Sequence, residues 1–273
     1  MILRLAAALL LVSLVAPVCA EPATPSLSTL EQAQLQQNLA LGALLYRYDQ
    51  SAWHVTDAAL AAQPEVIKTQ SRGYVTAPTP HGLKTTFFGQ TGEAYYPIYS
   101  AVWTGSKIED EQSYPDGRQQ TLTADDLRLI EARRVALDGA GQLAMCSKAR
   151  PNVIVVPDPA DGALTHVYIM TPQSRNDSFP MGGHHRIDVK EGKIVAQRAF
   201  AKSCLELGKQ PMPEGAKPVG MFITHLLDLV PTEIHIFTVL GSGFPLFIGV
   251  RDGRAYSVGI KDGQPQAELI NLP

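Results

Sequence analysis

The sequence lacks the short motifs that mark the commonest enzyme classes. It contains no Gly-x-Ser-x-Gly nucleophile elbow, no phosphate-binding loop, no dinucleotide-binding glycine fingerprint and no His-Glu-x-x-His zinc pair. The glycine loop GSGFPLF around Ser242 does not fit the elbow, and no Cys-x-x-Cys-His haem attachment occurs. These absences disfavour serine hydrolases, nucleotide enzymes, zinc peptidases and c-type haem proteins, and they leave open a site assembled from distant strands. No cofactor is indicated.

Clustered positive charge is also missing. The chain carries 23 basic and 26 acidic residues, a formal net charge of −3, and no run of Lys or Arg. Nucleic acids and anionic membrane surfaces are bound through clustered cations, so the charge pattern disfavours both as partners.

Long hydrophobic runs are confined to the N-terminus. Arg4 precedes an apolar run from Leu5 to Val15, and Pro17 and the small residue Ala20 follow. This is the pattern of a secretory signal peptide over residues 1–20, cleaved after Ala20. The run is shorter than the roughly 20 residues that span a bilayer, so a retained anchor is the less favoured alternative. We expect a periplasmic or secreted protein with no transmembrane segment after cleavage.

Cysteine is scarce, with three in the chain and two after the expected cleavage. An even pair in an oxidising compartment predicts a disulfide between Cys146 and Cys204. The alternative is that one of them is a reactive thiol.

Beyond a loose lead at residues 21–28, the chain predicts a single α+β domain over residues 29–273. A long helix is predicted from Thr29 to Ala62, because one stripe of apolar residues recurs at helical spacing. The stripe consists of Leu41, Leu45, Tyr48, Ala52, Val55 and Ala59. A second helix is predicted from an N-cap at Thr123 to about Leu137.

The remaining segments predict a mostly antiparallel β-sheet with helices packed on one side. Residues 74–104 are strand-rich, Pro97 indicates an edge strand or a bulge, and residues 107–120 are expected to form a polar loop. Asp252-Gly253 suits a tight hairpin turn. Further strands are expected at 153–157, 165–171, 184–190, 193–200, 219–226, 232–239, 244–250 and 254–260.

Histidines on three of these predicted strands make the first candidate site. Side chains alternate along a strand, so His185 shares a face with Ile187, while His184 points the other way. His225 and His235 also fall on apolar-leaning faces, the latter with Glu233. We therefore hypothesise a catalytic group that acts as a base or binds a divalent metal. Its residues are His185, His225, His235 and Glu233. The alternative is three core histidines hydrogen-bonded to the backbone.

The register of the hairpin after His185 bears on this hypothesis. A two-residue turn at Glu191-Gly192 pairs Val189 with Ile194 and His185 with Arg198. A three-residue loop would shift that pairing, and we favour the two-residue turn.

The polar face of the long helix makes the second candidate site. Asp49, Trp53 and Asp57 follow at spacings of four, and His54 and Asp57 are three apart. Asp49, Trp53, His54 and Asp57 are therefore candidate ligand-binding residues. The alternatives are that Trp53 packs under another layer and that the carboxylates form a solvated face.

The stretches LLYRYDQSAWHVTDAAL, GGHHR, KSCL and PTEIHIF together resemble a family of exported bacterial proteins of uncharacterised function. The resemblance covers most of the mature chain and implies export and one continuous module. It implies no activity and no catalytic residue.

Two classes of function follow from these observations. The first is a non-catalytic exported protein that binds an unknown small molecule or an envelope protein. The alternative is a hydrolase-like enzyme that uses the histidine group, with or without a metal. A third hypothesis is a folding helper or inhibitor that adds a strand at an exposed edge, with the strand around Pro97 as the candidate edge.

Overall fold

The computed structural model describes residues 26–208, 215 and 219–271. The predicted signal peptide, residues 1–20, and most of the expected loose lead lie outside the described residues. The predicted α+β fold is confirmed. In the described residues, three four-stranded sheets and one two-stranded sheet are joined by four α-helices.

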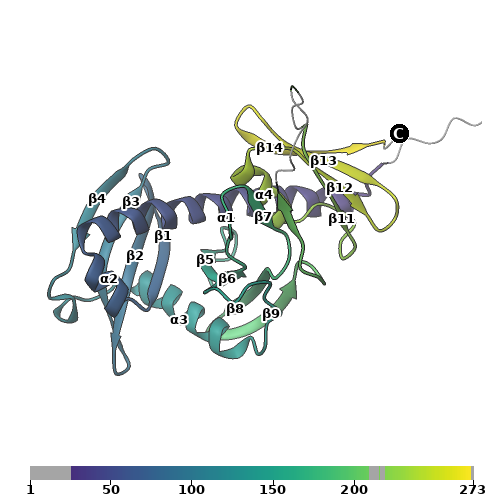
Figure 1. Cartoon of the computed structure of the whole chain (residues 1–273). Coiled ribbons are helices and arrows are strands. Elements are labelled where there is room, and N and C mark those ends of the chain that lie inside the picture. The colour runs from purple at the N-terminus through teal and green to yellow at the C-terminus, as the bar shows by residue number, and fades with distance from the viewer. Residues whose placement is uncertain (1–25, 209–214, 216–218, 272–273) are drawn as a thin grey trace, which may run out of the picture.

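The long helix α1, Thr29–Ala62, agrees with the prediction at both ends. A capping box starts it: the Ser28 side chain accepts from the Glu31 backbone and the Glu31 side chain accepts from the Ser28 backbone. All six residues of the predicted apolar stripe are buried. Figure 1 shows α1 running the length of the molecule past all three large sheets. No helix among the described residues is long and apolar enough to cross a membrane.

The first sheet has the order β1-β2-β3-β4 and is antiparallel throughout. Its strands are β1 (Gly73–Thr79), β2 (Gly82–Thr91), β3 (Ala94–Trp103) and β4 (Ile108–Ser113). Pro97 lies at a bulge inside this sheet, so the bulge alternative is correct and β3 is not an edge. The short helix α2, Pro64–Gln70, follows α1 and packs beside this sheet.

The prediction of a polar loop over residues 107–120 was wrong, because it contains β4 and the 3₁₀ turn η1, Gly117–Gln119. β4 is an edge strand with mostly exposed charged side chains, and an edge strand needs no apolar face. The strand-addition hypothesis also loses its candidate edge, since β4 covers β3.

The central sheet has the order β5-β6-β8-β9 and is also antiparallel. Its strands are β5 (Asn152–Pro157), β6 (Leu164–Met170), β8 (His185–Lys190) and β9 (Lys193–Ala199). Next to the β8–β9 turn, Val189 pairs with Ile194 as predicted. A bulge then shifts the register by one residue, so Arg198 lies opposite Arg186 and the predicted pairing with His185 was wrong.

Helices cover both faces of the central sheet. On one face, Ile187 and Val167 pack with Leu129 of α3, Ala124–Gly139. On the other face, Tyr168 packs with Leu45 of α1 and with α4, Glu233–Ser242. The sequence led us to expect helices on one side only. The second predicted helix is confirmed as α3, with Thr123 as its N-cap and an end two residues later than expected.

The third sheet has the order β11-β12-β13-β14. Its strands are β11 (Met221–His225), β12 (Leu246–Val250), β13 (Ala255–Lys261) and β14 (Gln264–Ile270). The Asp252-Gly253 turn joins β12 and β13 as predicted, whereas β14 was not foreseen. A small pair, β7 (Ser178–Pro180) with β10 (Glu206–Gly208), completes the described sheets.

The strand predicted at residues 232–239 was wrong, because this segment is helix α4. β11 and β12 are parallel, and parallel neighbours need a crossover, which α4 supplies. α4 packs so closely on α1 that a Cβ on Gly42 would lie 2.8 Å from the Glu233 carbonyl oxygen. This contact sets the position of the first turn of α4 over the central sheet.

Candidate functional site: a buried charge network and an open cleft

The predicted disulfide between Cys146 and Cys204 is present, with the two Cα atoms 5.4 Å apart. Gly182 and Gly183 lie against it. A Cβ on Gly183 would lie 2.6 Å from the Cys146 nitrogen, and one on Gly182 would lie 2.9 Å from the Cys204 Cα. Gly183 also has a positive φ of 68°. The glycine pair therefore allows a close backbone approach to the disulfide, which side chains would prevent.

The two histidines that follow make hydrogen bonds to the backbone. His184 Nε2 donates to the Pro180 carbonyl oxygen at 2.8 Å, and His185 Nε2 donates to the Ala144 carbonyl oxygen at 3.2 Å. Both side chains are buried. These contacts agree with the alternative of core histidines that bond to the backbone, and not with histidines that bind a metal.

His185 does not join the other two histidines of the predicted site. It lies on the face of β8 that carries Ile187 and packs on α3, whereas the next residue, Arg186, reaches α4 on the opposite face. His225 and His235 do meet, with ring centroids 4.7 Å apart. In the part of the chain that the structure describes, no group of three His, Cys, Asp or Glu side chains is arranged to hold a metal ion.

His235 lies in the first turn of α4 and caps it. Its Nδ1 accepts from the Thr232 backbone N–H at 2.9 Å, so the neutral ring carries its proton on Nε2. Burial, and to a lesser extent the nearby His225, lower the pKa of His235 to about 3. The ring is therefore uncharged near neutral pH, and its role in the structure is that of a cap.

Glu233 is fully buried, with 0% of its surface exposed, and its charge is balanced from the central sheet. Its Oε1 accepts from Arg186 Nη1 at 2.5 Å and from the Tyr168 hydroxyl at 3.4 Å. Its Oε2 is buried with no hydrogen-bond partner among the described residues. The negative charge also lies in the first turn of α4, where the helix dipole stabilises it.

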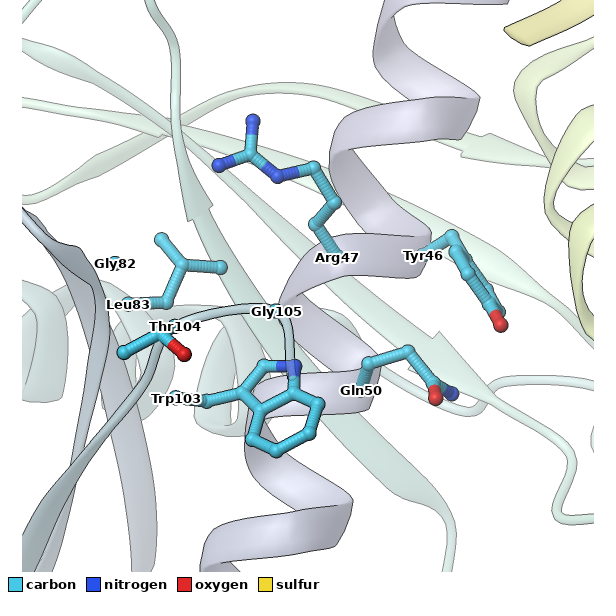
Figure 2. Close-up of a pocket in the computed structure, with 8 residues that line it drawn as sticks. All are labelled: Tyr46, Arg47, Gln50, Gly82, Leu83, Trp103, Thr104 and Gly105. Atoms are coloured by element: carbon cyan, nitrogen blue, oxygen red, sulfur yellow. The ribbon is translucent and has the colours of Figure 1, made fainter. Parts of the chain in front are cut away.

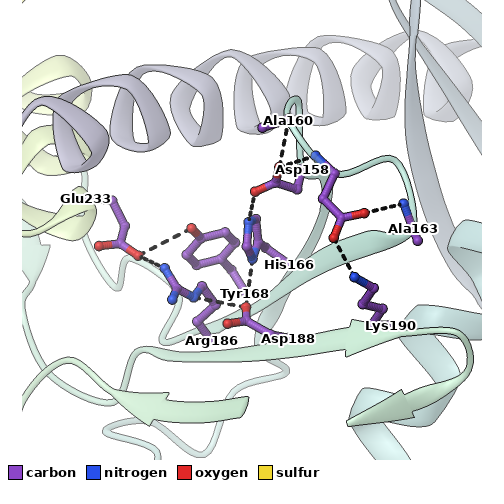
Figure 3. Close-up of polar contacts among 10 residues, drawn as sticks. Asp158, Ala160, Ala163, His166, Tyr168, Arg186, Asp188, Lys190 and Glu233 are labelled. Atoms are coloured by element: carbon purple, nitrogen blue, oxygen red, sulfur yellow. Dashed lines mark hydrogen bonds and ion pairs between the residues drawn. The ribbon is translucent and has the colours of Figure 1, made fainter. Parts of the chain in front are cut away.

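The network continues along the central sheet, as Figure 3 shows. Arg186 Nε lies 3.0 Å from Asp188 Oδ1, which contacts His166 Nδ1 at 2.7 Å. His166 Nε2 then contacts Asp158 Oδ2 at 2.9 Å. Charges of alternating sign therefore run from Glu233 to Asp158 without a break.

The two aspartates decide the charge of His166. Burial by itself would lower the pKa of His166, but the hydrogen bonds with Asp188 and Asp158 outweigh it and raise that pKa above the ordinary value. Burial would raise the pKa of both aspartates, but it is outweighed. The Asp161 backbone N–H and then His166 lower the pKa of Asp158, and His166 and then Arg186 lower that of Asp188. The two carboxylates thus stabilise the imidazolium form of His166.

A second group of charges surrounds His225. Asp228 Oδ2 accepts from His225 Nε2 at 2.8 Å and from Arg198 Nη2 at 2.9 Å. Burial opposes ionisation of Asp228, yet these two donors lower its pKa. Arg198 also lies over the Phe200 ring, 4.4 Å from its centroid.

Most members of these networks were not predicted as site residues. The only signal in the sequence was strand alternation, which placed Arg186 and Asp188 on one face with His184. Asp188 lies 22 residues from His166, and Glu233 lies 47 residues from Arg186, so only the fold brings this network together. Its arrangement holds α4 against the central sheet. Within the first network, Glu233 Oε2 and Arg186 Nε are buried without a hydrogen bond to any described residue.

The second predicted group does not form a single site. Trp53 is 56% exposed, and its ring lies 4.7 Å from the His54 ring, which stacks on Trp103 at 3.9 Å. Asp57 is exposed. Asp49 points elsewhere, toward Tyr74, and burial raises the pKa of its carboxyl to about 6. Trp53 and His54 therefore form an aromatic group with Trp103, and the two carboxylates do not share a site.

Beside this aromatic group lies an open cleft of about 210 Å³ between α1 and the first sheet. Figure 2 shows its lining. Leu83 at the start of β2 pairs with Trp103 at the end of β3, and Gly82 is required there because a Cβ would meet the Trp103 carbonyl oxygen. The lining residues are Tyr46, Arg47, Gln50, Gly82, Leu83, Trp103, Thr104 and Gly105.

Comparisons of the chain with protein-family models, with curated proteins and with solved structures gave no match. Functional inference therefore depends on the geometry described above.

The buried ion pair gives a first prediction. Arg186→Leu leaves Glu233 buried without its cation and is expected to lower the free energy of unfolding by about 3–5 kcal/mol. The double variant Arg186→Leu/Glu233→Leu is expected to lose less than Arg186→Leu alone, because both charges are then gone. Urea denaturation of the single and double variants measures this coupling.

The exposed pair Arg134–Glu131, at 2.6 Å, is the matched control, and its cycle is expected to give a coupling of about 0–1 kcal/mol. Additive losses at Arg186 and Glu233 would contradict a dependence of one charge on the other.

The histidines give a second prediction, with opposite signs. His166, whose folded pKa is raised, stabilises the fold below its unfolded pKa of about 6.5, and this contribution is lost as the pH rises through the folded pKa. His235, whose folded pKa is about 3, costs stability as the pH falls below about 6.5. NMR titration is expected to show one ring that titrates above about 6.5 and one that stays neutral at pH 4.

The variants His166→Gln and His235→Asn assign the two signals, and Asn retains an acceptor for the Thr232 backbone N–H. If the His166 signal titrated below the ordinary histidine pKa, the network of alternating charges would be wrong.

Proposed function

We propose that the chain is an exported, periplasmic or secreted protein that binds a small ligand without catalysis, and that the ligand lies in the cleft between α1 and Trp103. Residues 1–20 have the pattern of a secretory leader, and a disulfide is consistent with an oxidising compartment. The cleft supplies the binding surface.

One observation supports the non-catalytic part of this proposal. His225, His235 and Glu233 of the predicted catalytic group are buried, and none of them lines the open cleft. His225 and His235 are 5% and 3% exposed, and Glu233 is 0% exposed. A hydrolase that uses these three groups would need substrate to reach them. The hydrogen bonds they already make to Asp228, Thr232 and Arg186 hold the fold together.

The cleft has the mixed lining that small-ligand sites use. Trp103 and Leu83 offer apolar surface, while Gln50, Thr104 and the Tyr46 hydroxyl bring polar groups near it. Its volume of about 210 Å³ is below the roughly 300–1,000 Å³ that is usual for drug-sized ligands. The proposed ligand is accordingly small and only partly enclosed.

The export half of the proposal is tested on the expressed full-length chain. N-terminal sequencing of protein recovered from the periplasm or the medium of a bacterial host is expected to begin at Glu21. Retention of the uncleaved chain in the cytoplasm would contradict export and would leave the proposed ligand binding unaffected.

The binding half is tested with tryptophan fluorescence, because Trp103 lines the cleft and the chain's other tryptophan, Trp53, lies outside the lining. A panel of neutral sugars, amino acids, aromatic carboxylates and aromatic amides is titrated into the Trp53→Phe variant, in which Trp103 alone fluoresces. A saturable change in Trp103 emission is expected for at least one compound. Trp103→Leu should weaken binding of that compound about tenfold or more in ligand-observed NMR, as loss of a stacking ring requires.

The Trp53→Phe variant is also the control for the ring contact, since Trp53 lies outside the cleft lining and its replacement should leave affinity within about twofold. If no compound changes Trp103 emission, or if binding survives Trp103→Leu unchanged, the cleft is not the binding site.

A further inference from the structure

The cleft holds one formal charge, and that charge is unbalanced. Its lining includes Arg47 and no Asp or Glu. Arg47 is exposed and makes no ion pair with any of the described residues. Arg186, Arg198 and Arg254 are each paired with a carboxylate, whereas the half-buried Arg133 has no such partner among the described residues. In a chain with a net charge of −3, this cleft is therefore a local positive site.

A second cleft of comparable size shows the contrast. It is about 190 Å³ and contains Arg128 together with the carboxylates Glu131 and Glu191. Arg128 also donates to the Thr165 hydroxyl at 3.1 Å and lies 3.9 Å from Asp125. The protein therefore already balances the charge of Arg128, whereas the lining of the first cleft offers Arg47 no carboxylate.

The indole ring of Trp103, which lines the cleft together with Arg47, has a fixed orientation. The His54 ring stacks on Trp103 with 21° between the planes, and the backbone of Trp103 is paired with Leu83 in the sheet. Arg47, Gln50 and His54 lie on neighbouring turns of α1, so a single rigid helix positions the cation, the amide and the stacking partner of Trp103. A preorganised flat ring and a guanidinium that line the same cleft suit a flat ligand that carries an oxyanion.

We infer that the cleft binds a small aromatic carboxylate, with the carboxylate on Arg47 and the ring against Trp103. This inference rests on the proposed function and names its ligand class. The guanidinium presents paired N–H donors that match the two oxygens of a carboxylate, and a charged hydrogen bond of this kind is stronger than a neutral one. Gln50 and Thr104 provide further donors at the same cleft for ring substituents.

The experiment uses benzoate and its uncharged analogue benzamide, titrated by isothermal calorimetry into the mature chain, residues 21–273. Benzoate is expected to bind about tenfold or more tightly than benzamide, and its affinity should fall as NaCl is raised. Arg47→Gln should reduce benzoate binding to the level of benzamide and leave benzamide unchanged, while Arg47→Lys should retain part of the preference.

Arg251→Gln removes the same charge from an exposed turn outside the cleft and should change neither ligand by more than about twofold. Equal binding of benzoate and benzamide, or a benzoate affinity that survives Arg47→Gln, would overturn the ligand class. The proposed function would still be supported in that case if benzamide, or another neutral compound of the panel, binds to the protein and fails to bind to Trp103→Leu. If nothing in the panel binds, both proposals fail.

Discussion

The described fold depends on α1, because each large sheet takes part of its core from this one helix. Leu35 packs with the third sheet, Leu45 and Tyr48 with the central sheet, and Val55 and Ala59 with the first sheet. Four-stranded sheets of this size have to bury one face against another layer to be stable. The order of contacts along α1 therefore determines which sheet lies beside which, and Figure 1 shows them in that sequence along the helix.

The buried charges become understandable from the same arrangement. α4 is pressed onto α1 at Gly42, and its first turn then faces the central sheet with a carboxylate, Glu233, that water cannot reach. A buried carboxylate is tolerated when it is paired and hydrogen-bonded, and Arg186 supplies that pairing. Such a pair adds little net stability over an apolar contact, but removal of one partner is costly, so the pair favours a single placement of α4. We therefore see these titratable groups as determinants of helix position rather than of chemistry.

Much of the fold could be predicted from the sequence, and the candidate site could not. The apolar stripe of α1 and the N-cap at Thr123 are local signals, and both helices were located from them. The segment 232–239 is rich in β-branched and aromatic residues and is buried on nearly all sides, so its periodicity does not separate a strand from a helix. For the histidines, alternation correctly separated His184 from His185, but it does not say which layer covers each face. β8 is buried on both faces, so an apolar neighbour such as Ile187 did not mark the side on which α4 lies.

The cleft also follows from the course of α1. The helix passes over the paired ends of β2 and β3, where Leu83 meets Trp103, and Gly82 lets the two strands approach at that point. The polar face of α1, which the sequence marks with Arg47, Gln50 and His54, is then brought beside an aromatic ring from a strand about fifty residues later. Because the helix that lines the cleft also contributes to the cores of three sheets, the backbone of the lining is fixed before a ligand binds. The cleft is therefore preformed, and a small ligand loses less affinity to ordering of the protein than it would at a flexible loop.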